Sequence, residues 1–100
     1  MTDEALRRQI AALAADSSKV VVLEHAKARM LARGVTLAQV LEVLRRGAVC
    51  EPAHQHLKTG DWRCTLERRV AGDLVRVVGA VHRKATGEVV VVVTVIRARR

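Results

Sequence analysis

The chain has almost no aromatic residues: Trp62 is the only one among 100 residues, with no tyrosine and no phenylalanine. A core without further rings must be built from valine, leucine and alanine, and the apolar half of the sequence is enough for one small domain. One ring also argues against binding of single-stranded nucleic acid by stacking along several bases. We therefore expect Trp62 to anchor the core.

Cysteines and long hydrophobic runs are also scarce. Cys50 and Cys64 stand alone, outside any Cys-x-x-Cys pair, which favours reduced thiols over a disulfide or a zinc site. The valine run at 89–93 is too short to cross a bilayer, and residues 1–16 form a charged amphipathic segment rather than a signal peptide. These features predict a cytoplasmic protein that does not enter a membrane.

Negative charge is in short supply. The chain has ten Asp and Glu residues and eighteen Lys and Arg residues, which gives a net charge of +8. Fourteen of the eighteen cations are arginine. The planar guanidinium binds phosphate oxygens in pairs, so the bias favours a polyanionic partner such as RNA. An acidic protein partner fits the charge equally well.

Helical and strand signals occupy different halves of the chain. Residues of about 2–47 show helical spacing, and residues of about 48–97 alternate with a period of two, as in a β meander. The helices are expected at Asp3 to Ala15 after a Thr2 cap, at Glu24 to Ala32 before a left-handed Gly34, and from a Thr36 capping box to Gly47. In the third helix, Leu37, Val40, Leu41 and Leu44 share one stripe.

The strands predict an α+β domain in which two or three helices pack on a twisted antiparallel sheet of three long strands and a short fourth. Alternation places Trp62, Cys64 and Leu66 on one face, opposite Arg63 and Thr65. The last strand is apolar on both faces, with Val89, Val91, Val93 and Val95 opposite Val90, Val92 and Ile96. We expect the second face to be covered by the first helix, a homodimer partner or an antitoxin.

One helix carries a chemical stripe. His25, Arg29 and Arg33 drift by only about 40° per four-residue step, beside an apolar stripe that includes Ala26 and Met30. An imidazole in line with two guanidinium groups suits the binding and cleavage of a phosphodiester. It equally suits a structural histidine on a helix with a solvated basic edge.

The segment His25-Ala-Lys-Ala-Arg-Met-Leu-Ala-Arg-Gly-Val35, a capped helix ending at Gly47, Gly60-Asp61-Trp62-Arg63 and the Val-Thr-Val of the last strand together resemble the bacterial domain-of-unknown-function family 4258. The resemblance covers about Lys19 to Arg97. It implies a relationship to RelE-type toxins, whose α+β fold cleaves messenger RNA and is neutralised by an antitoxin. The tyrosines and most of the lysines of the better-known RelE-like nucleases are missing here.

These observations lead to two hypotheses. In the first, the protein is a metal-independent endoribonuclease in which a base takes the 2′-hydroxyl proton and cations stabilise the phosphorane. Its candidate catalytic residues are His25, Arg29, Arg76 and His82, and its candidate RNA-binding residues are Arg33, Arg63 and Arg97. No cofactor is expected, and the pair His54 and His56 lacks the further ligands of a metal site. In the second, the protein is a non-catalytic module that binds nucleic acid or protein.

Overall fold

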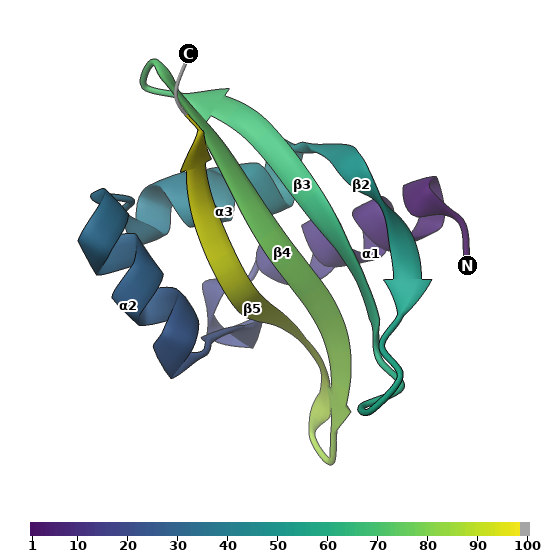
Figure 1. The fold of residues 1–100 in the computed structure, drawn as a ribbon. Coiled ribbons are helices and arrows are strands. Elements are labelled where there is room, and N and C mark those ends of the chain that lie inside the picture. The colour runs from purple at the N-terminus through teal and green to yellow at the C-terminus, as the bar shows by residue number, and fades with distance from the viewer. Residues whose placement is uncertain (99–100) are drawn as a thin grey trace.

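The first and third helices begin at a threonine that caps them, and the second begins at Leu23 without a side-chain cap. The computed structural model describes residues 1–98 and contains α1 (Asp3–Ala14), α2 (Glu24–Arg33) and α3 (Leu37–Arg46) (Figure 1). The Thr2 hydroxyl accepts a hydrogen bond from the Ala5 amide, and Thr36 forms a capping box with Gln39. Gly34 ends α2 at a φ of 67°, where a side chain would be strained. The three predicted helices are confirmed.

The sheet has five strands rather than the expected three or four. These are β1 (Val20–Val22), β2 (Ala48–Gln55), β3 (Trp62–Val70), β4 (Asp73–Lys84) and β5 (Gly87–Ala98), in the order β1-β5-β4-β3-β2. Two features account for the difference between the expected sheet and the observed one. The three valines of β1 pair in parallel with β5, so the sheet is mixed, and β2 continues past Pro52 because an edge strand tolerates a missing amide donor.

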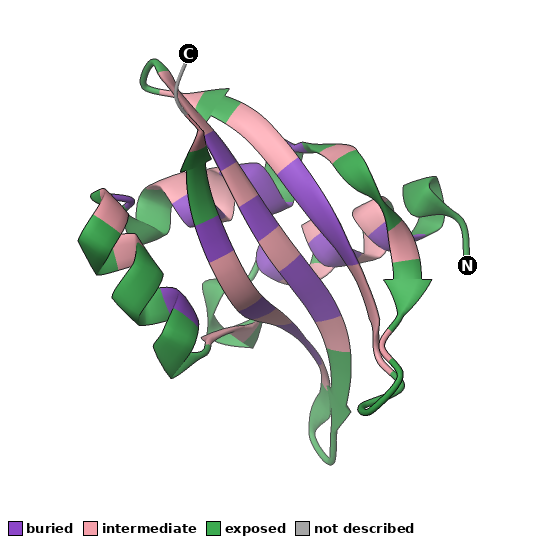
Figure 2. Ribbon diagram, viewed as in Figure 1, coloured by how far each residue is buried: buried purple, intermediate pink, exposed green. Residues whose placement is uncertain are grey.

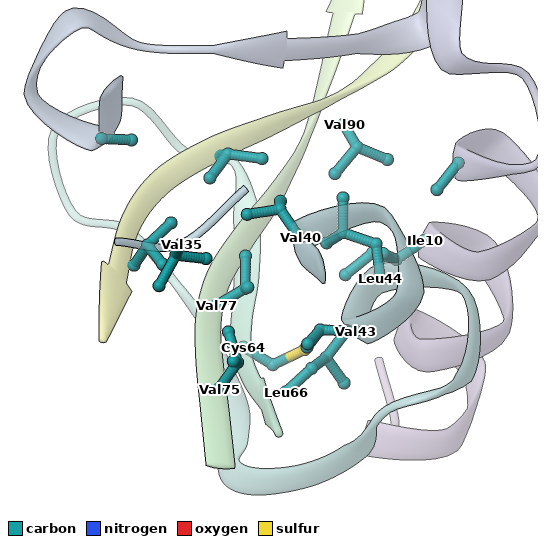
Figure 3. Packing of buried hydrophobic residues seen from close by; sticks show 14 of the residues in the cluster. Ile10, Val35, Val40, Val43, Leu44, Cys64, Leu66, Val75, Val77 and Val90 are labelled. Carbon is teal, nitrogen blue, oxygen red and sulfur yellow. The ribbon is translucent and has the colours of Figure 1, made fainter. Parts of the chain in front are cut away.

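Helices α1 and α3 pack on one face of the sheet and form the core with it (Figures 1 and 3). Ile10 of α1 and Leu44 of α3 are fully buried against the valines of β4 and β5. In α3 the buried residues are Val40, Val43 and Leu44, whereas Leu37, expected on the same stripe, is 48% exposed. Trp62 is half-buried and packs against this core.

The second face of the sheet is not covered by any helix within residues 1–98. The expectation that the first helix shields it is wrong, because Leu6, Ile10 and Ala14 of α1 all belong to the core on the other side. Figure 2 shows buried and half-buried residues along the middle of β3, β4 and β5, with α2 standing beside β5 rather than across the strands. Val78, Val91 and Val93 are its half-buried apolar members.

A β-bulge in β5 changes which of its residues face the core. Val78 pairs with Thr94 and Gly79 with Val92, so Val93 has no partner in the register with β4. The extra residue shifts the alternation, and Val95 joins Val90 and Val92 as a fully buried residue. The expected grouping of Val95 with Val89, Val91 and Val93 is therefore wrong. Ile96 is 37% exposed instead of buried with Val90.

Candidate nucleic-acid interface

Helix α2 presents His25 and Arg29 on its exposed surface. Ala26 is fully buried and Met30 packs against the core, which fixes how the helix is rotated. At about 100° per residue, Arg29 lies about 60° and His25 about 100° around the helix from Ala26, on the side away from Met30. Since Met30 turns toward the core, the two polar residues turn toward the side of the uncovered sheet face.

Arg29 differs from every other arginine that the structure describes. Within residues 1–98 it makes neither a hydrogen bond nor an ion pair, whereas each of the remaining eleven contacts a carboxylate or a backbone carbonyl. Arg99 and Arg100 lie outside the described residues. A guanidinium without an internal partner keeps all five donors for a ligand.

Arg33 and Arg97 are brought together, but their donors are used within the fold. The Nη1 of Arg33 donates to the Val95 carbonyl at 2.9 Å, which satisfies the edge of β5 beyond the end of β1. The Nη1 of Arg97 donates to the Arg33 carbonyl at 3.0 Å, and its Nη2 pairs with Asp73 at 2.9 Å. Both arginines tie α2 to the sheet: Arg33 binds a carbonyl of β5 that a partner strand would otherwise bind, and Arg97 binds the carbonyl at the end of α2.

Arg76 lies in a polar cluster on the uncovered face. Its Nε pairs with the Glu67 carboxylate at 2.9 Å, and this contact raises the pKa of Arg76. Burial raises the pKa of the neighbouring Cys50 thiol, and the charge of Glu67 adds to the effect. The buried Thr65 hydroxyl donates to Glu51 at 2.9 Å. Arg76 therefore already has a counter-charge, and the raised pKa makes the Cys50 thiol a weaker acid than a free cysteine.

Arg63 is largely enclosed by the protein. Its side chain is 14% exposed and pairs with Asp61 at 3.1 Å. Desolvation raises the pKa of Asp61, but hydrogen bonds from Thr59 and Arg63 outweigh it, so the pKa is lowered. The Nε of Arg63 is buried without a partner among the described residues. This residue acts within the sheet, with little surface to offer RNA.

His82 stands at the far end of β4 from Arg76. Six residues of strand separate them, which is about 20 Å. His82 pairs with Val89, and the Leu23 amide binds the Val92 carbonyl on the other side of β5, so the backbones at His82 and Leu23 are about 14 Å apart. Because the Leu23 amide binds Val92 and Arg33 binds Val95, α2 runs alongside the later half of β5, whereas His82 pairs with Val89 near its start. The structure therefore brings His25 and Arg29 together, and it brings neither His82 nor Arg76 to them.

Neither a metal site nor a membrane-spanning helix is found within residues 1–98. No group of three or more His, Cys, Asp or Glu side chains there is arranged to hold a metal ion. The Nδ1 of His56 instead accepts hydrogen bonds from the Lys58 and Thr59 amides at 3.3 Å, within the loop that follows β2. No helix in the described part of the chain is long and apolar enough to span a membrane.

Sequence reasoning missed the Glu67–Arg76 pair and the neighbourhood of Trp62. The alternation of β3 and β4 does place Glu67 and Arg76 on the same face, so the signal was available, but their register depends on the hairpin turn. The indole lines a cavity of about 340 Å³ together with His82, and no local pattern joins those two residues.

Comparison with known proteins identifies the family. Residues 22–97 match the family described as Domain of unknown function (DUF4258), so the chain belongs to it. Comparisons with curated proteins and with solved structures give no match.

Proposed function

We propose that this DUF4258 protein is a toxin-like, metal-independent endoribonuclease of the RelE type that holds RNA against the exposed side of α2. The observation that carries the proposal is the free guanidinium of Arg29, one helical turn from the exposed imidazole of His25. A basic protein that uses its other described arginines internally still presents this pair to solvent. A phosphate anion is the ligand that such a pair fits best.

In this reaction His25 removes the proton of the 2′-hydroxyl, and the resulting oxygen attacks the adjacent phosphorus. Arg29 stabilises the negative charge of the phosphorane, and the bond to the 5′-oxygen breaks. The leaving 5′-oxygen takes its proton from solvent, since His82 is not brought to His25 and Arg29. The products are a 2′,3′-cyclic phosphate and a free 5′-hydroxyl, and the net reaction consumes no water and needs no oxidant.

The test uses purified protein, single-stranded RNA and EDTA, with cleavage and binding measured separately. We expect His25→Ala to lower the cleavage rate by about 10²- to 10⁴-fold, the usual contribution of a general base, with little change in RNA affinity. Arg29→Gln should weaken binding and reduce the dependence of log K on log salt by about one phosphate contact.

Lys27→Gln is the matched control. Lys27 lies on the same helix, about 160° around from Arg29, and it pairs with Glu24 at 3.1 Å. The Lys27→Gln substitution removes one positive charge, as Arg29→Gln does, but from a different side of α2, so the cleavage rate should be unchanged. Folded wild-type protein that neither binds nor cleaves RNA, and that does not arrest bacterial growth when induced, would refute the proposal.

A non-catalytic protein-binding module is the second candidate, and the uncovered sheet face favours it. Val78 and Val91 are half-buried apolar residues on adjacent strands of that face, and the net charge of +8 disfavours a second copy of the chain as the occupant. The fitting partner is an acidic protein, such as an antitoxin-like neighbour. Val78→Glu should then abolish capture of that partner while RNA binding at α2 persists.

A further inference from the structure

A cavity of about 340 Å³ opens where the β2–β3 loop approaches the β4–β5 hairpin, next to α1. Its lining includes Gln9, Thr59, Asp61, Trp62, His82 and Arg83. This volume lies within the range of pockets that hold small ligands. The cavity is separate from the His25–Arg29 side of α2, because no residue of α2 lines it.

Trp62 gives the cavity a rigid aromatic wall. The residue begins β3, pairs with Val81 of β4 and packs against the hydrophobic core. One side of the indole is therefore fixed by packing, and its remaining surface lines the cavity. A held indole face stacks on any planar base, at little cost in side-chain entropy.

Polar groups around the indole suit the edge of a base. The Nε2 of Gln9 donates to Glu88 at 3.1 Å, which leaves the Gln9 carbonyl oxygen as an acceptor. The Asp61 carboxylate accepts from Arg63 and retains further lone pairs. The Thr59 hydroxyl lies beside them and is already bound to His56 and to the Asp61 amide, so it holds the loop rather than the base. Amino and imino groups of nucleobases match this set of acceptors.

Cations stand where the phosphate of such a base would lie. Arg83 lines the cavity, is 82% exposed and reaches Glu88 only at 3.8 Å. Lys58 lies in the β2–β3 loop and Lys84 ends β4 at the same end of the sheet, and neither has an ion pair with residues 1–98. The cavity therefore combines one stacking surface, acceptor groups and nearby positive charge.

We propose that this cavity binds a nucleobase stacked on Trp62, with its phosphate toward Arg83. The base comes from RNA or from a free nucleotide, and both share the planar ring and the phosphate. The inference rests on the proposed RNA-directed function, because it assigns one base of that RNA to a defined position.

Intrinsic fluorescence tests the site directly, since Trp62 is the only tryptophan and the chain has no tyrosine. We expect GMP, AMP and UMP to quench the emission in a saturable way, the purines more strongly, and ribose 5-phosphate to leave it unchanged. Free N-acetyltryptophanamide corrects for light absorbed by the nucleotides. Quenching at lower concentrations by an RNA oligonucleotide than by its mononucleotides would assign the site to RNA, and equal concentrations would assign it to a free nucleotide.

A second measurement uses the anisotropy of fluorescein-labelled RNA to compare the wild-type protein with two variants of Trp62. Trp62→Leu should weaken binding by about five- to a hundred-fold, the usual effect of losing one stacked base, and Trp62→Phe should restore most of it. Arg83→Gln should weaken binding of mononucleotides without altering the fluorescence of the free protein. The fluorescence titration of the wild-type protein tests base binding even if Trp62→Leu does not fold.

The experiments distinguish failure of the base site at Trp62 from failure of the proposed ribonuclease. RNA that binds in the anisotropy assay without quenching Trp62, and equally well to Trp62→Leu, overturns the base site and leaves RNA binding at α2 intact. Mononucleotides that quench Trp62, in a protein that neither retains nor cleaves labelled RNA, refute the ribonuclease and support the base site.

Discussion

Replacing Gly47 by alanine would place a methyl group in space that backbone atoms already fill. A Cβ at this position would lie 2.5 Å from the Val43 carbonyl oxygen and 3.0 Å from the Glu67 carbonyl oxygen. Neither oxygen can turn away, because Val43 ends the hydrogen-bonded turn of α3 and Glu67 is paired within the sheet. Gly47 has a φ of −72°, so close approach, and not backbone conformation, requires glycine here.

Gly79→Ala is the matched comparison. Its Cβ would lie 3.4 Å from a Leu44 methyl and 3.7 Å from Ile10 and Val90 methyls, which is ordinary contact. Both substitutions restrict the unfolded chain and gain about 0.4–1 kcal/mol from that effect. The difference between the variants therefore isolates the steric term, for which overpacking predicts about 1–3 kcal/mol against Gly47→Ala.

Thermal unfolding followed by circular dichroism measures this difference. For a domain of this size, 1 kcal/mol corresponds to about 4–8 °C, so the two midpoints should differ by about 4–24 °C, with Gly79→Ala the higher. Urea unfolding gives the same comparison as a free energy. Equal midpoints for the two variants would refute the close packing of α3 against β3 at Gly47.

Three further predictions concern single positions. At pH 8 an alkylating reagent should label Cys50 and spare Cys64, because Cys64 is buried and burial raises its thiol pKa to about 11, whereas both thiols should react in urea. Hydrogen bonds from two arginines lower the pKa of Glu4 to about 2, so its ion pairs should persist below pH 4.5 and be lost as the pH falls through about 2, which NMR titration of the carboxyl carbon measures. In urea unfolding, Val77→Thr should lower the free energy of unfolding by about 1–3 kcal/mol and the adjacent Val78→Thr by less than about 0.5 kcal/mol, because Val77 is fully buried and Val78 lies on the uncovered face. Equal losses would mean that this face is covered in solution.

Local signals determined what the sequence could predict. A capping box at Thr36 and Gln39, a Thr2 cap and a left-handed Gly34 are short-range features, and the helices begin and end beside them. The alternation of β3 likewise separates the core-facing Leu66 from Thr65 on the other side. Such features act over four or five residues, so a single chain is enough to read them.

Pairing between distant segments could not be predicted in the same way. The partner of β1 is β5, about seventy residues later, and the bulge at Val93 becomes visible only in the register with β4. The structural use of Arg33 depends on the Val95 carbonyl, which is left free because β1 ends at Val22. Charge and helical spacing made Arg33 and Arg29 equivalent in the sequence, and only tertiary contacts distinguish them.

The net charge of +8 and the binding of a phosphate depend on different cations. Eighteen Lys and Arg residues outnumber ten Asp and Glu residues, so the excess charge cannot be neutralised within the chain. An arginine bound to a carbonyl, such as Arg33, keeps its full charge and still contributes to the field that draws a polyanion to the surface within about 8–10 Å. Binding a phosphate through Arg33 would, however, cost its hydrogen bond to Val95, whereas Arg29 has no internal contact to lose. The whole set of cations should therefore govern how fast RNA arrives at different salt concentrations, and Arg29 should govern how long it stays.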